Sequence, residues 1–182
     1  LRTQVPEEPQ SFDDINFIRN TFLIRDAQAA VVRIPINFSG NRFFNRVEVR
    51  DSTAGNCTFS DNEFSSDGSS YATGIYIAGS VPYVGVIGNY FHDITYQAIF
   101  ATVQSGQSQN GVIDIVNNYF KNNGFVGPQP TIAFTQNSVN RISIRGNYFE
   151  STAGSFTMRL ANANGEVIEN TVDKPIDWEV PA

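Results

Sequence analysis

The chain has 182 residues, of which 41% are hydrophobic, 13% aromatic and 16% charged, with a formal net charge of −6. This composition is typical of one folded domain with its own core and argues against a disordered chain, while the scarcity of lysine leaves no basic stripe for a nucleic-acid partner. A single cysteine argues against a disulfide framework, and the lack of a long apolar run argues against a membrane span.

The two ends differ from the rest of the chain. Residues 1–10 carry two prolines and two glutamates without a basic and apolar targeting pattern, so we expect a linker or N-terminal extension, in a processed chain or an excerpt of a longer one. We expect one folded domain over residues 11–174. Residues 175–182, with Trp178, are expected to cap its far end.

A short motif recurs along the domain. Residues 84–91, 113–120 and 142–149 read VGVIGNYF, IDIVNNYF and ISIRGNYF, and weaker copies begin at residues 15, 36, 57 and 165. Every copy has an asparagine, with apolar residues three positions before it and two positions after it, which predicts two short strands that flank a tight turn. The shared residues are Asn20, Asn41, Asn62, Asn89, Asn118, Asn147 and Asn170. They are 21 to 29 residues apart by subtraction, and such variable spacing indicates loops of variable length.

Each unit also contains an apolar alternation upstream, which predicts a third strand. The alternating residues are Val47 and Val49, Ile75 and Ile77, Ile132 and Phe134, then Phe156, Met158 and Leu160, with Ile99 and Ala101 as a less clear pair. One unit alone is one layer thick and cannot bury its apolar side chains, so the units must stack strand upon strand. The sequence therefore predicts an all-β fold, a parallel β-helix of about seven coils. We expect the asparagine to take the left-handed backbone conformation at each corner and its amide to bond from coil to coil.

These residues resemble the parallel β-helix proteins of the pectate-lyase-like superfamily. The resemblance covers about the whole chain and implies a right-handed β-helix with three short parallel sheets, in which Asn20 through Asn170 form an asparagine ladder. The superfamily includes lyases, glycoside hydrolases, epimerases, phage tailspikes and virus-surface proteins, so the likeness specifies a fold rather than an activity. Family members usually cover the first coil with an amphipathic helix, and nothing before Ser11 has that pattern.

Three tyrosines occupy the position directly after the asparagine in successive units and are expected to point outward. They are Tyr90, Tyr119 and Tyr148, flanked two positions later by His92, Lys121 and Glu150. Tyrosine offers a flat apolar ring with a polar tip, so this ribbon is a candidate carbohydrate-binding surface. Equally, stacked aromatic residues could hold the sheet in register or form a subunit contact.

Acid–base chemistry has two candidate locations. His92 precedes Asp93 and could act near neutral pH, although a solvent-facing histidine without catalytic duty explains the pair as well. In enzymes of the resembled family the substrate groove follows the first strand of each coil, where Glu48 and Tyr76 would point outward. Glu48 and Asp51 are the candidate catalytic pair, and ion pairs of these acids with neighbouring arginines are the alternative.

Two functions follow from this set of residues. The first is a polysaccharide-binding module of tailspike or depolymerase type, with degradation by a glycoside hydrolase or lyase mechanism left open. The second is a non-catalytic structural module, trimeric, on a virus or cell surface. No acid cluster for Ca²⁺ is evident, so we expect neither a metal nor another cofactor. We expect a polysaccharide or surface glycan as partner, a homo-oligomer or a longer chain, and an extracellular, secreted or virion-surface location.

Overall fold

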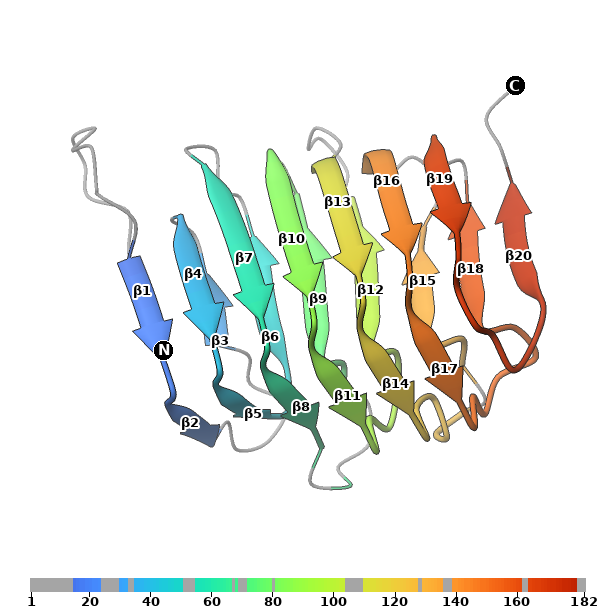
Figure 1. Ribbon diagram of the computed structural model, residues 1–182, viewed down its shortest axis with the longest axis horizontal. Helices are drawn as coiled ribbons and strands as arrows, with labels where there is room; N and C mark the ends of the chain where they lie inside the picture. Colours follow the sequence, from blue (N-terminus) through green and yellow to red (C-terminus); the bar gives the residue numbers. More distant parts are fainter. Residues whose placement is uncertain are drawn as a thin grey trace.

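The computed structural model describes residues 15–23, 30–32, 35–50, 55–66, 68, 72–79, 81–103, 110–127, 129–135, 139–161 and 164–179. These residues form strands and turns without a helix, and the strands make three parallel sheets that run the length of the molecule (Figure 1). The fold is therefore an all-β parallel β-helix, as the repeat predicts. The described part contains no helix long and apolar enough to cross a membrane.

The three sheets are named here A, B and C. Sheet B contains β1 (Ile15–Ile18), β4 (Ile36–Ser39), β7 (Asn56–Ser60), β10 (Tyr83–Ile87), β13 (Asn110–Val116), β16 (Val139–Arg145) and β19 (Gly165–Ile168). Sheet C contains β2 (Thr21–Leu23), β5 (Arg42–Phe44), β8 (Glu63–Ser65), β11 (Tyr90–His92), β14 (Tyr119–Lys121) and β17 (Tyr148–Glu150). Sheet A contains β3 (Ala30–Val32), β6 (Val47–Arg50), β9 (Ile75–Ala78), β12 (Ile99–Thr102), β15 (Ile132–Phe134), β18 (Met158–Ala161) and β20 (Ile176–Glu179).

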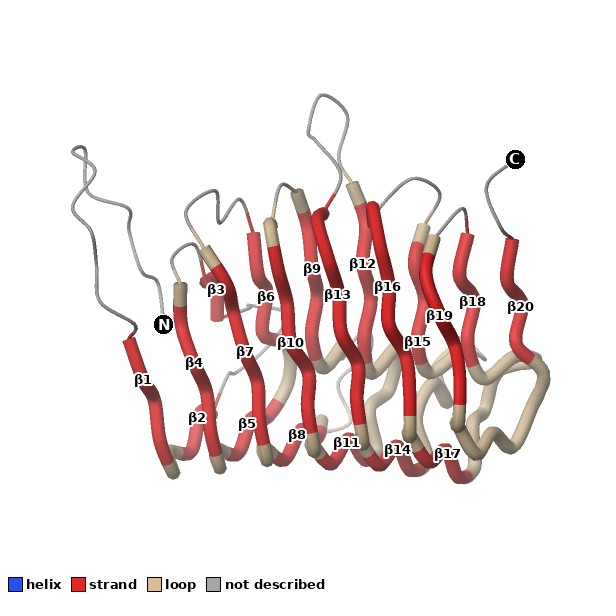
Figure 2. Tube along the Cα trace, turned by 45° about the horizontal axis from the view of Figure 1, so that its top comes forward, coloured by secondary structure: helices blue, strands red, loops and turns tan. Residues whose placement is uncertain are grey.

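Each coil passes through the sheets in the order B, C, A. In Figure 1 the strands of sheet B lie in front and run downward, those of sheet A lie behind and run upward, and successive coils advance from left to right, so the helix is right-handed. The view in Figure 2 separates the three rows of strands and shows the short sheet C along the lower edge. Every strand pairing is parallel, and equivalent residues of successive coils lie side by side, as Val84 does with Ile113 and Ile113 with Ile142.

The core consists of columns of like side chains. A phenylalanine stands two residues after every ladder asparagine except Asn170, and it stacks on its equivalent in the next coil, with ring centroids 4.6 to 4.9 Å apart. This column contains Phe22, Phe43, Phe64, Phe91, Phe120 and Phe149. Parallel stacking at this distance is favourable for aromatic rings and repeats once per rung of the sheet. Cys57 fills an inward position of sheet B and is fully buried, as expected.

The asparagine ladder is present through all seven units. In the middle of the stack, the Asn118 side-chain oxygen accepts hydrogen bonds from the Asn89 backbone N–H (2.8 Å) and the Asn89 amide (3.0 Å). The Asn118 amide in turn donates to the Asn147 side-chain oxygen (3.0 Å) and to the Val86 carbonyl (2.8 Å). The same bonds connect the other ladder residues, from Asn20 to Asn170. The ladder thus gives buried backbone groups at the corner a partner where the strands end.

The corner geometry corrects one expectation. The residue with positive φ is the one before each ladder asparagine, and not the asparagine itself: Arg19, Gly40, Asp61, Gly88, Asn117, Gly146 and Glu169, with φ between 54° and 68°. A left-handed residue turns the chain so that the next side chain points into the molecule and can stack. The glycines of the motif serve this position, because glycine takes a positive φ without steric cost.

The last units deviate from the expected pattern. Val172 was expected to be inward like the phenylalanines, but it is 37% exposed, because only Thr171 of that segment bridges to sheet C. Phe156 precedes β18 and is half-buried rather than in the core, with the Arg159 guanidinium 5.5 Å from its ring. Trp178 is on β20, which adds a strand to sheet A, and it packs partly buried against the core. A separate capping function for residues 175–182 stays a prediction.

Candidate carbohydrate-binding surface

The tyrosine ribbon lies on the outer face of sheet C. Tyr90, Tyr119 and Tyr148 are direct neighbours across β11, β14 and β17, and the residue between each tyrosine and the next outward position is a core phenylalanine. The alternation follows from strand geometry, in which successive side chains point to opposite faces. Burying the phenylalanine column therefore places the three tyrosines on one outer row.

The tyrosine rings contact one another along this row. The ring centroids of Tyr90 and Tyr119 are 5.2 Å apart and nearly parallel, whereas Tyr119 and Tyr148 are 5.4 Å apart and meet edge to face. Tyr148, at one end of the row, is 49% exposed. At the other end, the Tyr90 ring stacks on the ring of His92, two residues later on the same strand, with centroids 4.6 Å apart. The predicted residues Tyr90, Tyr119, Tyr148 and His92 thus lie together in one surface.

A charged cluster lies at one end of the ribbon. The Lys121 Nζ is 3.2 Å from Glu150 Oε1, and the Tyr119 hydroxyl donates a hydrogen bond to the other oxygen of the same carboxylate. These hydrogen bonds hold the pKa of Glu150 below its usual value and raise the pKa of both Tyr119 and Lys121. At neutral pH the cluster therefore combines a carboxylate, an ammonium and a protonated phenol.

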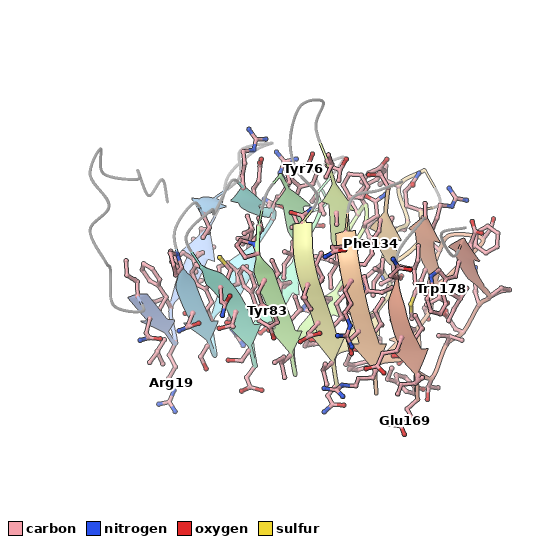
Figure 3. All side chains as sticks on the ribbon, turned by 90° about the horizontal axis from the view of Figure 1, so that it is seen from above. Arg19, Tyr76, Tyr83, Phe134, Glu169 and Trp178 are labelled. Atoms are coloured by element: carbon pink, nitrogen blue, oxygen red, sulfur yellow. The ribbon has the colours of Figure 1, made fainter. Side chains whose placement is uncertain are left out.

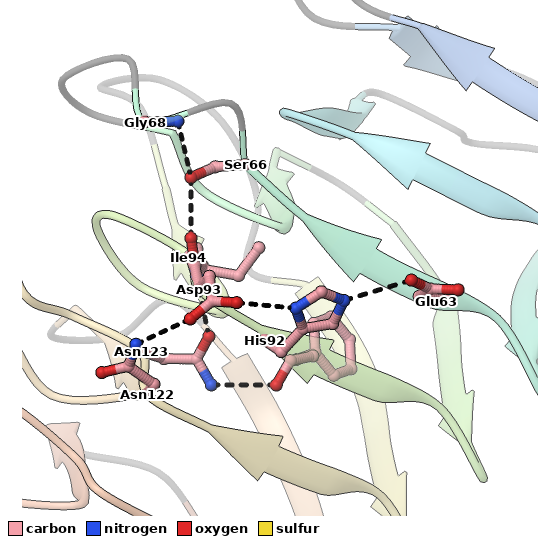
Figure 4. A network of polar contacts seen from close by, with 9 residues as sticks. Glu63, Ser66, Gly68, His92, Asp93, Ile94, Asn122 and Asn123 are labelled. Carbon is pink, nitrogen blue, oxygen red and sulfur yellow. Dashed lines mark hydrogen bonds and ion pairs between the residues drawn. The ribbon is translucent and has the colours of Figure 1, made fainter.

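A second cluster surrounds His92 at the other end (Figure 4). The His92 Nδ1 is 2.9 Å from Asp93 Oδ2, and Nε2 is 3.2 Å from Glu63 Oε1, so both ring nitrogens face a carboxylate. The Asn122 amide donates to the remaining Asp93 oxygen at 2.6 Å, and Arg42 pairs with Glu63 at 2.9 Å. The hydrogen bonds from His92 and then Asn122 lower the pKa of Asp93. Sequence analysis missed Glu63 and Asn122 as members, because each lies 29 residues from its partner.

The remaining predicted site residues lie on sheet A, away from the ribbon. The Glu48 side chain is buried between two arginines, 3.5 Å from Arg46 and in contact with Arg50, so the ion pairs suggested as the alternative are present. The Arg46 guanidinium also lies 5.1 Å from the ring of Tyr76, which is adjacent to Phe100. Asp51, the expected second acid, lies outside the described residues. Catalysis by the Glu48 and Asp51 pair stays a prediction.

No group of three histidine, cysteine, aspartate or glutamate side chains suited to a metal ion occurs within the described ranges. No protein-family model, curated protein or solved structure matches the chain. Function is therefore inferred from the geometry of the surfaces themselves.

Proposed function

We propose that this β-helix binds a polysaccharide or surface glycan along the tyrosine ribbon of sheet C. The observation that carries the proposal is the register of Tyr90, Tyr119 and Tyr148, which lie one rung apart on three consecutive strands. Rungs are about 4.8 Å apart, so the row places three aromatic rings in contact along the axis of the rod. A chain of sugar rings presents apolar C–H faces at regular intervals, and a rigid strip of phenol rings matches such a ligand.

The polar groups beside the row suit sugar hydroxyls. Glu150, Lys121 and His92 lie on the outward position next to the tyrosines, on the same three strands. Carboxylates accept hydrogen bonds from hydroxyls and an ammonium donates to hydroxyl or acetal oxygens. Glu150 pairs with Lys121, and His92 pairs with Asp93 and Glu63, so these groups are held in place before the ligand arrives, which lowers the entropic cost of binding.

A glycan array with matched variants tests the proposal. We expect Tyr119→Ala to weaken array binding by about tenfold or more, equivalent to about 1.4 kcal/mol, because it breaks the aromatic strip at its centre. Ile87→Ala, which truncates a 40% exposed apolar side chain on sheet B, is the matched control and should leave binding unchanged. Equal array signals for Tyr119→Ala and the parent protein, with both folded, would remove the ribbon from this role.

We further propose that the protein degrades the glycan it binds, with Glu48 and Asp51 as the acid pair. The release of reducing ends from the polysaccharide that the array identifies measures degradation directly. Glu48→Gln should abolish this release, while binding at the ribbon persists. Release that is unchanged in Glu48→Gln and in Asp51→Asn would eliminate this acid pair. A glycan-binding protein of this kind would operate at a virion surface or outside the cell.

The second candidate function is a structural, trimerising module in which the ribbon is a subunit contact. The observation that favours it is that the polar tips already have partners in the protein, Tyr119 and Lys121 on Glu150 and His92 on two carboxylates. Light scattering separates the two functions. A trimer that dissociates in Tyr119→Ala, with no glycan bound by the parent protein, supports the structural function.

A further inference from the structure

A second polar surface, which we name the sheet B groove, lies on the outer face of β13, β16 and β19. It is a shallow hollow of about 280 Å³ lined by Val112, Asp114, Arg141, Ser143, Arg145 and Glu166. It lies on a different sheet from the tyrosine ribbon. Figure 3 shows Tyr83, which is on sheet B, on the opposite side of the rod from Tyr76.

The strand register arranges the charged groups of the groove as a cross. Asp114, Ser143 and Glu166 are neighbours across the three strands, so the two carboxyl-bearing residues lie two rungs apart, about 9.6 Å between Cα atoms. Arg141 and Arg145 lie two residues before and two residues after Ser143 on β16, about 6.6 Å away in each direction. Acids therefore lie on either side of a small central residue, and arginines lie above and below it.

Each carboxylate in the groove is held by a hydroxyl. The Ser143 Oγ donates to Glu166 Oε1 at 2.8 Å, and the Tyr83 hydroxyl donates to Asp114 Oδ2 at 3.1 Å. Tyr83 reaches Asp114 because Gly85 lies between them in the same outer row and has no side chain, and a Cβ at Gly85 would lie 3.0 Å from the tyrosine hydroxyl. Within the described ranges, no other hydrogen bond reaches the second oxygen of either carboxylate.

The charged side chains described in the groove do not form ion pairs with one another. Among the described residues, no ion pair joins Arg141 or Arg145 to Asp114, Glu166 or any other acid, although these residues lie on adjacent strands. This differs from sheets A and C, where Arg42, Arg46, Arg50, Lys121 and Arg159 all pair with acids. The groove thus presents two cations and two anions that are set apart by the strand geometry.

We propose that the sheet B groove binds a zwitterionic group, in which an ammonium lies a few bonds from a phosphate or carboxylate. The ammonium would sit over Ser143 between Asp114 and Glu166, where two carboxylates create a negative centre. The anionic part would extend along β16 to Arg141 or Arg145, whose planar guanidinium groups suit oxyanions. A ligand with one charge would meet two like charges in this groove, whereas a zwitterion satisfies both pairs.

Titration calorimetry with small probes tests this assignment independently of the ribbon. Phosphoethanolamine carries both charges, while inorganic phosphate and ethanolamine carry one each, and β-alanine replaces the phosphate by a carboxylate. We expect phosphoethanolamine or β-alanine to bind at least about tenfold more tightly than either single-charge probe. A stronger response to one of the two zwitterions identifies phosphate or carboxylate as the preferred anion.

Four variants link the binding to the groove. We expect Asp114→Asn and Glu166→Gln each to weaken binding of the preferred probe by about fivefold or more, and at least one of Arg141→Gln and Arg145→Gln to do the same, with the circular dichroism spectrum unchanged. Arg19→Gln, at a corner far along the rod, is the matched control and should have no effect. Phosphate binding as tight as that of the zwitterion, or no binding of either zwitterion, would overturn the proposal.

Discussion

Removing one asparagine side chain from the ladder should lower the free energy of unfolding by an amount that depends on how deeply that asparagine is buried in the stack. In Asn118→Ala, the backbone N–H of Asn89 loses its acceptor at a site that water does not reach, since Asn89 is 1% exposed. An unsatisfied buried donor costs about 1–3 kcal/mol, and each further hydrogen bond lost costs about 0.5–1.5 kcal/mol. The Asn118 amide also donates to Val86 and Asn147, so we expect a total loss of about 3–5 kcal/mol.

The matched variant is Asn170→Ala at the last rung. Asn170 makes the same bond to the Asn147 backbone N–H, but its side chain is partly exposed, so water can replace the amide and we expect a loss of about 1 kcal/mol. Urea unfolding followed by circular dichroism gives both free energies, provided that the two variants have the same dependence on urea concentration. A cost for Asn118→Ala no larger than that for Asn170→Ala would refute the view that the ladder stabilises by satisfying buried backbone groups.

Three further changes test other parts of the structure. Phe91→Ala should lower the free energy of unfolding by about 3–5 kcal/mol, because it opens a cavity in the middle of the stacked column. Phe22 is only half-buried, so Phe22→Ala should lower it by about half as much. Equal losses for the two variants in urea unfolding would contradict this reasoning. Glu48→Ala should lower the free energy of unfolding by about 2–3 kcal/mol, because two arginines lose a buried partner, without changing binding at the ribbon. Because the pKa of Asp93 is lowered from its ordinary value of 3.8, the ionised carboxylate stabilises the fold at pH values above 3.8. This stabilisation is lost as the pH falls through the lowered pKa. Unfolding measured between about pH 5 and pH 2 should therefore show a smaller acid loss in Asp93→Asn than in the parent protein.

The fold could be predicted from sequence because its signal repeats. Seven asparagines with apolar neighbours at fixed offsets specify which residues lie side by side, and the ladder and the phenylalanine column both confirm that register. The conformation of the corner could not be assigned in the same way. Several residue types fill the position before the asparagine, among them Arg19 and Glu169, which have no intrinsic preference for positive φ. The glycines at positions 40, 88 and 146 were the available signal.

The exposure of residues at the end of the stack could not be predicted from the repeat either. Val172 matches the motif as well as any phenylalanine does, but burial of an inward residue depends on a following coil, which the motif itself does not encode. The tyrosine row was predicted correctly because the three residues share one offset from the ladder. The contact between Glu63 and His92 was hidden because the two residues have different offsets from the ladder, one and three positions after the asparagine. Asn122 and Asp93 share one offset, four positions after the asparagine, so their contact had a signal in the repeat.

The sheet B groove had a sequence signal that was missed. Asp114, Ser143 and Glu166 each stand four residues before a ladder asparagine, at Asn118, Asn147 and Asn170. Outward positions upstream of the corner therefore form columns as regular as those downstream. The bond from Tyr83 to Asp114 could not be foreseen, since it depends on the ring crossing a glycine to reach the next strand.

Because successive coils share one register, a whole coil can be removed from the rod or added to it. Asn89, Asn118 and Asn147 are separated by equal intervals of 29 residues, and each is followed by the same tyrosine and phenylalanine. Excising residues 90–118 would join Asn89 to Tyr119, recreate the junction that stood there before, and shorten the rod by one layer of about 4.8 Å. Coil number is therefore a quantity that evolution or an engineer can change in whole steps, because each layer contacts only the layers directly above and below it.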